Sequence, residues 1–182
     1  MYADLNSTTP PEEKDEWRTE PVLFNLLDQE FNFQLDVAAT DDNALCPVYF
    51  TKEQNALELP WADWFSAPPA IFCNPPFSQV GPFLLKGREE AAKGATCVFL
   101  VRADGLETVW WREGVLRKVY DHLYVPNYEI RFLSPRTNYY RPVVTKATGV
   151  RFPSVVIVMR SYTVLDPKVF WWNWKDNLVP KL

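Results

Sequence analysis

The residues Asn74-Pro75-Pro76-Phe77 directly follow a short apolar run over residues 70–73. The apolar run predicts a buried strand of a parallel sheet. Proline cannot donate to a sheet ladder and fixes its own φ, so the strand must end at the first proline. This predicts a rigid corner at the carboxyl end of a strand, which is where open α/β sheets bind ligands.

The corner presents an amide, a carbonyl and an aromatic ring, a combination that suits methyl transfer to an exocyclic amino nitrogen. An aromatic amine is a poor nucleophile because its lone pair is delocalised into the ring. If the Asn74 side-chain oxygen and the Pro75 carbonyl accept from the amino N–H groups, the nitrogen moves towards sp³ and its lone pair is freed. Phe77 can stack on the heterocycle, and a base in a duplex would have to be flipped out to reach it. The same four residues also occur as an ordinary turn after a strand, so their context decides between the two interpretations.

The composition predicts one globular domain that binds no metal. The chain has 182 residues, of which 47% are hydrophobic and 23% are charged, and it holds no apolar run long enough to span a membrane. The acidic start is no signal peptide, so we expect a cytoplasmic protein. Cys46, Cys73 and Cys97 are widely spaced and predict reduced core thiols. With His122 the only histidine and no Cys-x-x-Cys spacing, a metal site is not expected.

The charge is divided unevenly along the chain. Residues 1–95 carry 6 Lys/Arg against 16 Asp/Glu, a net −10, whereas residues 96–182 carry 13 against 7, a net +6. Six basic residues and no acidic residue lie between positions 130 and 165. This segregation favours a face that binds a polyanion, although the same arginines could be scattered over a solvated surface.

The first ordered segment predicts a helix followed by a strand that receives a nucleotide-like cofactor. Thr19 is the expected N-cap of a helix over residues 20–31, with Pro21 in its first turn. The strand at 33–38 carries Asp36 and ends in the small residues Ala38 and Ala39, which allow close backbone approach. No Gly-x-Gly-x-x-Gly is present, which argues against a dinucleotide.

Strands alternate with helices along the rest of the chain, which predicts an α/β sandwich with a mostly parallel central sheet. Residues 1–16 are expected to form a poorly ordered acidic tail, and residues 17–182 a single domain. The segment 134–152 is polar, aromatic and basic without a clear period, which predicts a long loop. The aromatic cluster near the C-terminus is expected to pack on its own domain or to form an interface. The expected strands lie at 48–50, 71–73, 96–101 and 155–159, and two further strands lie within 120–132, divided at residues 126–127. The expected helices run from residue 78 to an end at residues 93–94 and over residues 109–116.

Several motifs in a fixed order give the chain a resemblance to a known family. They are Trp17-x-Thr19-x-Pro21, Phe33-x-Leu35-Asp36-Val37-Ala38-Ala39, Asn43-Ala44-x-Cys46, Leu57 with Trp61, and Asn74-Pro75-Pro76-Phe77. In this order they resemble the phage-type DNA N6-adenine methyltransferases, the Dam family of bacteriophages. The likeness covers most of residues 17–160.

The resemblance implies a Rossmann-like methyltransferase sheet with an antiparallel strand near its end, and S-adenosylmethionine as the methyl donor. It implies that the enzyme methylates the N6 amino group of adenine, flipped out of double-stranded DNA. Asn74, Pro75, Pro76 and Phe77 match the catalytic corner of the family. The cofactor residues implied by position are Thr19, Pro21, Asp36, Ala38, Ala39 and Asn55.

A DNA-contacting element is expected in the segment 134–152, because only 37 residues separate Asp36 from Asn74. Basic side chains there suit phosphates, and amide and phenol groups can reach base edges. The alternatives are methylation of another planar nitrogen (cytosine N4, an RNA base or a protein glutamine) and a non-catalytic nucleic-acid-binding module. The expected contacts are Arg136, Asn138, Tyr139, Tyr140, Arg141, Lys146 and Arg151.

Overall fold

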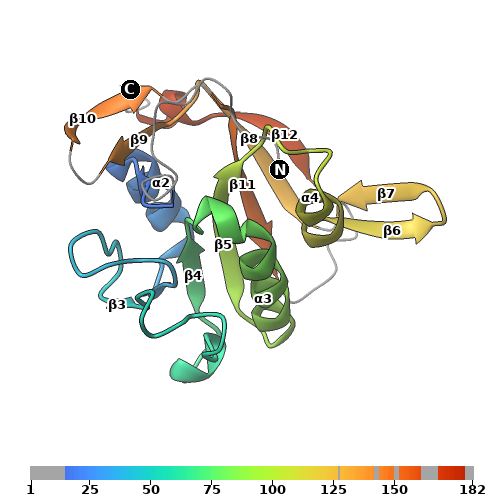
Figure 1. Cartoon of the computed structure of the whole chain (residues 1–182), viewed down its shortest axis with the longest axis horizontal. Coiled ribbons are helices and arrows are strands. Elements are labelled where there is room, and N and C mark those ends of the chain that lie inside the picture. Colours follow the sequence, from blue (N-terminus) through green and yellow to red (C-terminus); the bar gives the residue numbers. More distant parts are fainter. Residues whose placement is uncertain (1–14, 127, 142–143, 150–151, 161–167, 179–182) are drawn as a thin grey trace.

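The computed structural model describes residues 15–126, 128–141, 144–149, 152–160 and 168–178. Of the segment expected to be a disordered tail, all but Asp15 and Glu16 lies outside these residues. Within the described part, seven strands form a central sheet (Figure 1). Their order across the sheet is β12 (Val169–Asn173), β8 (Glu129–Ser134), β11 (Ser154–Met159), β5 (Thr96–Arg102), β4 (Ala70–Cys73), β2 (Leu35–Asp36) and β3 (Val48–Tyr49).

The central sheet is mostly parallel, as the sequence predicts. β3, β2, β4 and β5 run parallel to one another, and β12 runs parallel to β8. β11 is antiparallel to both of its neighbours, β5 and β8. The expected mixed α/β architecture with an antiparallel strand late in the chain is therefore confirmed.

Helices cover both faces of the sheet because the central strands are apolar on both sides. In β5, Val98 and Leu100 pack in the cluster that contains Leu23 and Leu27 of α2 (Pro21–Phe31). The alternate residues of β5 pack with α3 (Val80–Ala92) and α4 (Val109–Gly114) on the opposite face. This pattern gives three layers, as expected for a buried parallel strand (Figure 1).

The helix boundaries follow their capping residues. Gly94 has φ +116, which only glycine adopts without strain, and it lies two residues beyond the end of α3. Thr108 caps α4, and its hydroxyl accepts from the Trp111 N–H at 3.4 Å. The predicted N-cap of α2 is wrong by one residue: Glu20 occupies that position, because Thr19 pairs in a strand instead.

The segment 134–152 contains two strands, where the sequence predicts a loop. β9 (Asn138–Arg141) and β10 (Val144–Gly149) form a hairpin, and β9 also pairs with β1 (Arg18–Thr19). The partner strand β1 lies more than 100 residues earlier in the chain. Because pairing between such distant segments leaves no local period, the sequence does not reveal it.

A second hairpin, β6 (Leu116–Tyr120) and β7 (Leu123–Pro126), projects from the body of the protein beside α4 (Figure 1). The sequence predicts two strands divided near Pro126, which correspond to β7 and β8, but it does not reveal β6. The 3₁₀ helices are η1 (Ala62–Trp64), η2 (Phe77–Gln79) and η3 (Trp174–Leu178).

The aromatic residues near the C-terminus are divided between the core and the surface. Trp174 is fully buried and its indole N–H donates to the Pro135 carbonyl at 2.7 Å, whereas Trp171 on the edge strand β12 is 75% exposed. The three cysteines are buried free thiols, which confirms that part of the prediction. Among the described residues, no helix is long and apolar enough to cross a membrane.

Candidate active site

The predicted corner is present at the carboxyl end of β4. β4 ends at Cys73, and after the two prolines the chain turns directly into η2 and then α3. The Gln79 N–H donates to the Pro76 carbonyl at 2.8 Å, which closes the turn. Because both prolines have restricted φ angles, the chain holds Asn74 and Phe77 at the edge of the sheet with little freedom.

The orientation of the Asn74 amide is determined by one hydrogen bond. Its Nδ2 donates to the Trp17 carbonyl at 2.7 Å, and this leaves Oδ1 on the other side of the amide. Asn74 Oδ1 is buried and has no hydrogen-bond partner among the described residues. A buried acceptor without a donor costs about 1–3 kcal/mol, so Asn74 Oδ1 is a candidate acceptor for a bound group that donates to it.

Residues 15–19 form a strap across the carboxyl edge of the sheet. Besides the Trp17 carbonyl, the strap is held by Asp15, whose carboxylate accepts from the Ser78 N–H at 2.9 Å and from the Ser78 hydroxyl at 2.5 Å. At its far end, Arg18 and Thr19 pair with β9. The strap therefore joins the Asn74 corner to the β9–β10 hairpin.

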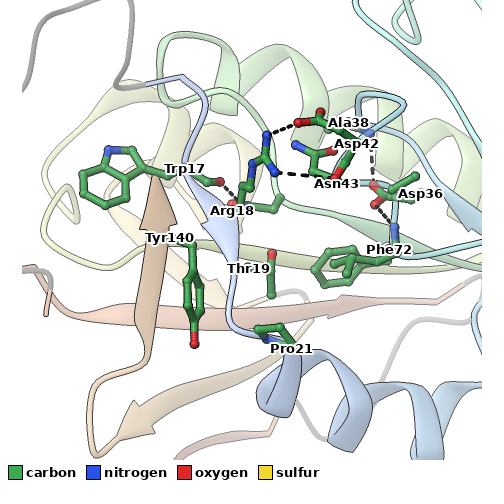
Figure 2. Close-up of a pocket in the computed structure, with 13 residues that line it drawn as sticks. Trp17, Arg18, Thr19, Pro21, Asp36, Ala38, Asp42, Asn43, Phe72 and Tyr140 are labelled. Atoms are coloured by element: carbon green, nitrogen blue, oxygen red, sulfur yellow. Dashed lines mark hydrogen bonds and ion pairs between the residues drawn. The ribbon is translucent and has the colours of Figure 1, made fainter. Parts of the chain in front are cut away.

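A cavity of about 380 Å³ lies beside Asn74, between the strap and the loop after β2 (Figure 2). Its volume is within the usual range for sites that bind small molecules. Four of the six predicted cofactor residues line it, namely Thr19, Pro21, Asp36 and Ala38. The other residues that line it are Trp17, Arg18, Asp42, Asn43, Ala44, Leu45, Phe72, Asn74 and Tyr140.

Asp36 is buried at the floor of this cavity. Its carboxylate accepts from the backbone N–H groups of Ala38 and Leu45, both at 3.3 Å. Burial raises the pKa of Asp36 to about 6, and these two hydrogen bonds only partly oppose the effect. The carboxylate thus shapes the loop after β2 and also faces the cavity.

The other two predicted cofactor residues do not line the cavity. Ala39 is buried, and its N–H donates to the Phe50 carbonyl at 3.1 Å. Asn55 is exposed in a turn after β3 and has φ 53, in the left-handed region.

An ion pair that the sequence does not predict forms part of the cavity wall (Figure 2). Arg18 on the strap lies 2.6 Å from the carboxylate of Asp42, in the loop after β2. The pKa of Asp42 is lowered, first by the hydrogen bond from the Thr40 hydroxyl and then by Arg18. The Nε atom of Arg18 is buried and has no partner among the described residues. The only signal for Arg18 in the sequence is its place between Trp17 and Thr19 of the first motif.

The predicted nucleic-acid contacts whose side chains the structure describes differ in their surroundings. Tyr139 is fully buried and its hydroxyl lies 3.1 Å from Ser154 Oγ, so the predicted contact between Tyr139 and a base does not fit its position. The Asn138 side chain donates to Glu20 at 3.3 Å, and Tyr140 lines the cavity. Arg136 is exposed. The side chains of Arg141 and Lys146, and the whole of Arg151, lie outside the described residues.

Two of the six basic residues between positions 130 and 165 are paired with acidic side chains of the protein. Arg131 is buried, and its guanidinium donates to Glu30 at 2.6 Å and to Glu129 at 2.7 Å. Arg160 donates to Glu129 at 3.1 Å. These ion pairs remove both arginines from the expected basic face, so this face is smaller than the sequence indicates.

Comparison with known proteins adds to this geometry. Residues 6–173 match the family model described as DNA N-6-adenine-methyltransferase (Dam). The chain belongs to the Dam family. A DNA N-6-adenine-methyltransferase of Haemophilus phage HP1 is 30% identical over 134 residues, which cover 72% of this chain and 73% of the relative. A DNA N-6-adenine-methyltransferase of Escherichia phage T1 is 27% identical over 108 residues, which cover 59% of this chain and 43% of that relative.

The resemblance read from the spaced motifs is thus confirmed, and for this Dam family member the corner and the cavity are the candidate active site. Within the described part of the chain, no group of three or more His, Cys, Asp and Glu side chains is placed to hold a metal ion.

Proposed function

We propose that this protein transfers a methyl group from S-adenosylmethionine to the N6 amino group of adenine in double-stranded DNA. Membership of the Dam family and the names of the two phage relatives support the reaction. The observation that carries the proposal is the buried Asn74 Oδ1, an acceptor without a protein donor among the described residues, at the rim of a cavity of ligand size.

The arrangement of the sheet supports a Rossmann-like methyltransferase fold. Ligands of open α/β sheets bind at the carboxyl ends of parallel strands, and both β2 and β4 end at the cavity. The strand β11, antiparallel between β5 and β8, agrees with the antiparallel strand that the resemblance implies.

The residues that line the cavity fit the proposed cofactor. The buried Asp36 carboxylate can accept a hydrogen bond from a hydroxyl or amine, the Phe72 ring offers an apolar wall, and Thr19 offers a hydroxyl. The buried Arg18 Nε is a donor still without a protein partner in the described part of the chain. Bound S-adenosylmethionine would supply an electrophilic methyl group. Ala39 and Asn55 would support the surrounding loops and not contact the cofactor.

At the corner, the protein would activate the target amine by hydrogen bonding. Asn74 Oδ1 and the Pro75 carbonyl would accept from the two amino hydrogens, so that the nitrogen lone pair is directed towards the methyl group. Phe77 would stack on the flipped base and hold its plane. The hydrogen bond to the Trp17 carbonyl keeps the Asn74 amide from turning its N–H₂ towards the amine. No strong general base is needed, because the amine can lose its proton to solvent after the transfer.

We assign DNA contact to the β9–β10 hairpin and the residues around it. Arg136 is exposed there, and Arg141, Lys146 and Arg151 follow along the same segment. Basic residues at these positions would bind the phosphates. The strap would link the hairpin to Asn74, because it pairs with β9 and accepts a hydrogen bond from the Asn74 amide.

The first test is methyl transfer from labelled S-adenosylmethionine to unmethylated double-stranded DNA, followed by digestion to nucleosides. We expect the label in N6-methyladenine. Label in N4-methylcytosine, in RNA or in protein glutamine would mean that this other planar nitrogen, and not adenine N6, is the methyl acceptor. Failure to bind S-adenosylmethionine in calorimetry would contradict the enzyme and favour a non-catalytic nucleic-acid-binding module.

A further inference from the structure

Arg102, the last residue of β5, lies among the aromatic rings that surround the Asn74 corner. Its guanidinium carbon is 5.4 Å from the centre of the Phe77 ring and 4.5 Å from the centre of the Phe152 ring. Both distances are within the range of an attractive cation–π contact. Arg102 therefore contacts the Phe77 ring, on which the target base would stack in the proposed reaction.

Asp104 holds the Arg102 guanidinium in place. Its carboxylate accepts from Arg102 Nε at 2.9 Å and also from Arg102 Nη2, so the two groups pair in a bidentate manner. A bidentate pair restricts the plane of the guanidinium as well as its position. The guanidinium can thus present its flat face to a ring in one orientation.

The central sheet brings Phe152 to Arg102. Ser154 at the start of β11 pairs with Arg102 at the end of β5, and the Ala103 N–H donates to the Pro153 carbonyl at 2.9 Å. These contacts hold the chain just before β11 beside the end of β5. Along the chain, Phe152 lies between β10, which ends at Gly149, and β11, which begins at Ser154.

The Phe77 ring is held by its neighbours on more than one side. Phe152 meets it edge-to-face with ring centres 5.4 Å apart, and Tyr139 meets it in the same way at 6.3 Å. Tyr139 is itself immobilised by burial and by its contact with Ser154. The edge-to-face contacts with Phe152 and Tyr139, together with the Arg102 guanidinium near the Phe77 ring, define the plane of that ring.

We propose that Arg102, oriented by Asp104, is a positioning residue that holds the Phe77 ring in the plane required for stacking on the target base. This inference rests on the proposed function, because it assigns a task to Phe77 in the transfer. The pair is at the surface, with side chains 29% and 34% exposed, so it adds little to the stability of the fold. Its contribution should therefore appear in the turnover rate and not in unfolding.

The test compares Arg102→Met and Arg102→Lys with a matched control, Arg112→Met. Arg112 also forms an ion pair, with Glu113 at 3.6 Å on α4, and it is 43% exposed. Methionine keeps length and apolar bulk without charge, while lysine keeps the charge without the flat bidentate face. For each protein we would measure kcat, KM for S-adenosylmethionine, the unfolding midpoint and the ring signals of ¹³C-labelled phenylalanine by NMR. The Phe77 signal would be assigned from Phe77→Tyr.

We expect Arg102→Met to lower kcat about 10-fold, with KM for S-adenosylmethionine changed less than about 2-fold. Arg102→Lys should recover part of the activity, and Arg112→Met should resemble the unmodified protein. The Phe77 signals should shift in Arg102→Met at an unchanged unfolding midpoint. An unchanged kcat and an unchanged Phe77 signal in Arg102→Met would overturn the inference, and so would a fall in kcat explained by unfolding. If no methyl transfer to DNA is found, that finding contradicts the proposed function. The NMR signals would still show whether Arg102 determines the position of the Phe77 ring.

Discussion

The Asn74 amide illustrates how one hydrogen bond determines which atom of a side chain is available. Asparagine offers a donor and an acceptor of nearly equal size, and either could face the site. The Trp17 carbonyl binds the donor, which leaves the oxygen as the free acceptor. An amine that donates hydrogen bonds from both of its N–H groups requires this orientation.

Replacing Asn74 by alanine removes this acceptor, and we expect methyl transfer to fall by about 100-fold or more. Binding of S-adenosylmethionine should stay within a few-fold of the unmodified protein, because Asn74 contributes only to the rim of the cavity. Calorimetry would measure binding and the nucleoside assay would measure transfer. Asn173→Ala, an exposed position on β12, is the control. Transfer by Asn74→Ala at the normal rate would contradict the proposed mechanism.

The raised pKa of Asp36 leads to a prediction about pH. In the folded state the pKa is about 6, against an ordinary value of 3.8, so between these pH values the folded protein holds a proton that the unfolded chain releases. This group therefore stabilises the fold at low pH, and its contribution disappears as the pH rises through about 6.

Asp36→Asn should remove this dependence. Between about pH 4 and pH 7, the unfolding free energy of the variant relative to the unmodified protein should rise by up to about 3 kcal/mol. Urea unfolding at a series of pH values would measure it. If the difference in unfolding free energy between the variant and the unmodified protein stays constant over this pH range, the pKa of Asp36 is not raised by burial.

At the scale of elements, Glu20 joins the start of α2 to the start of β9. Its buried carboxylate accepts from the Thr137 hydroxyl at 2.9 Å and from the Asn138 N–H at 2.8 Å. β1 pairs with β9 directly before this point, so the same contact helps to seat the strap. The contacts of Glu20 thus add to the buried Tyr139 of β9 in tying the hairpin and the strap to the main domain.

Glu20→Ala should lower the unfolding free energy by about 3 kcal/mol, because buried donors lose a charged acceptor. It should also weaken binding of S-adenosylmethionine, since Thr19 and Pro21 on either side line the cavity. Urea unfolding and calorimetry would measure the two effects. Glu58→Ala, at an exposed turn position, should change neither. Full stability of Glu20→Ala would mean that these hydrogen bonds do not hold the hairpin.

At the scale of the whole molecule, the net charge of −4 opposes binding to DNA, so any basic face must act locally. Arg131 and Arg160 are already paired with acids. The proposed phosphate contacts are therefore left to the residues on the β9–β10 segment and beside it.

Changing both Arg141 and Lys146 to glutamine should weaken DNA binding and flatten the slope of log K against log salt concentration by about 2, one unit for each phosphate that the variant no longer neutralises. Fluorescence anisotropy over a salt series would measure the slope. Lys52 and Lys175, both exposed and outside this segment, form the matched double control. An equal effect of the control pair would indicate a general charge effect without a specific face.

Local patterns in the sequence determined much of this protein. The apolar run before Asn74, the two prolines, the helical period of α2 and α3 and the alternating strands depend on neighbouring residues, and the structure has them where they were predicted. The family could also be read from its spaced motifs. Only the tertiary structure decided the contacts between segments far apart in the chain. It paired β1 with β9, buried Tyr139, enclosed Arg131 between Glu30 and Glu129, and brought Arg18 to Asp42 and Arg102 to Phe77. These contacts depend on how the strands are ordered across the sheets, and that order leaves no period or motif along the sequence.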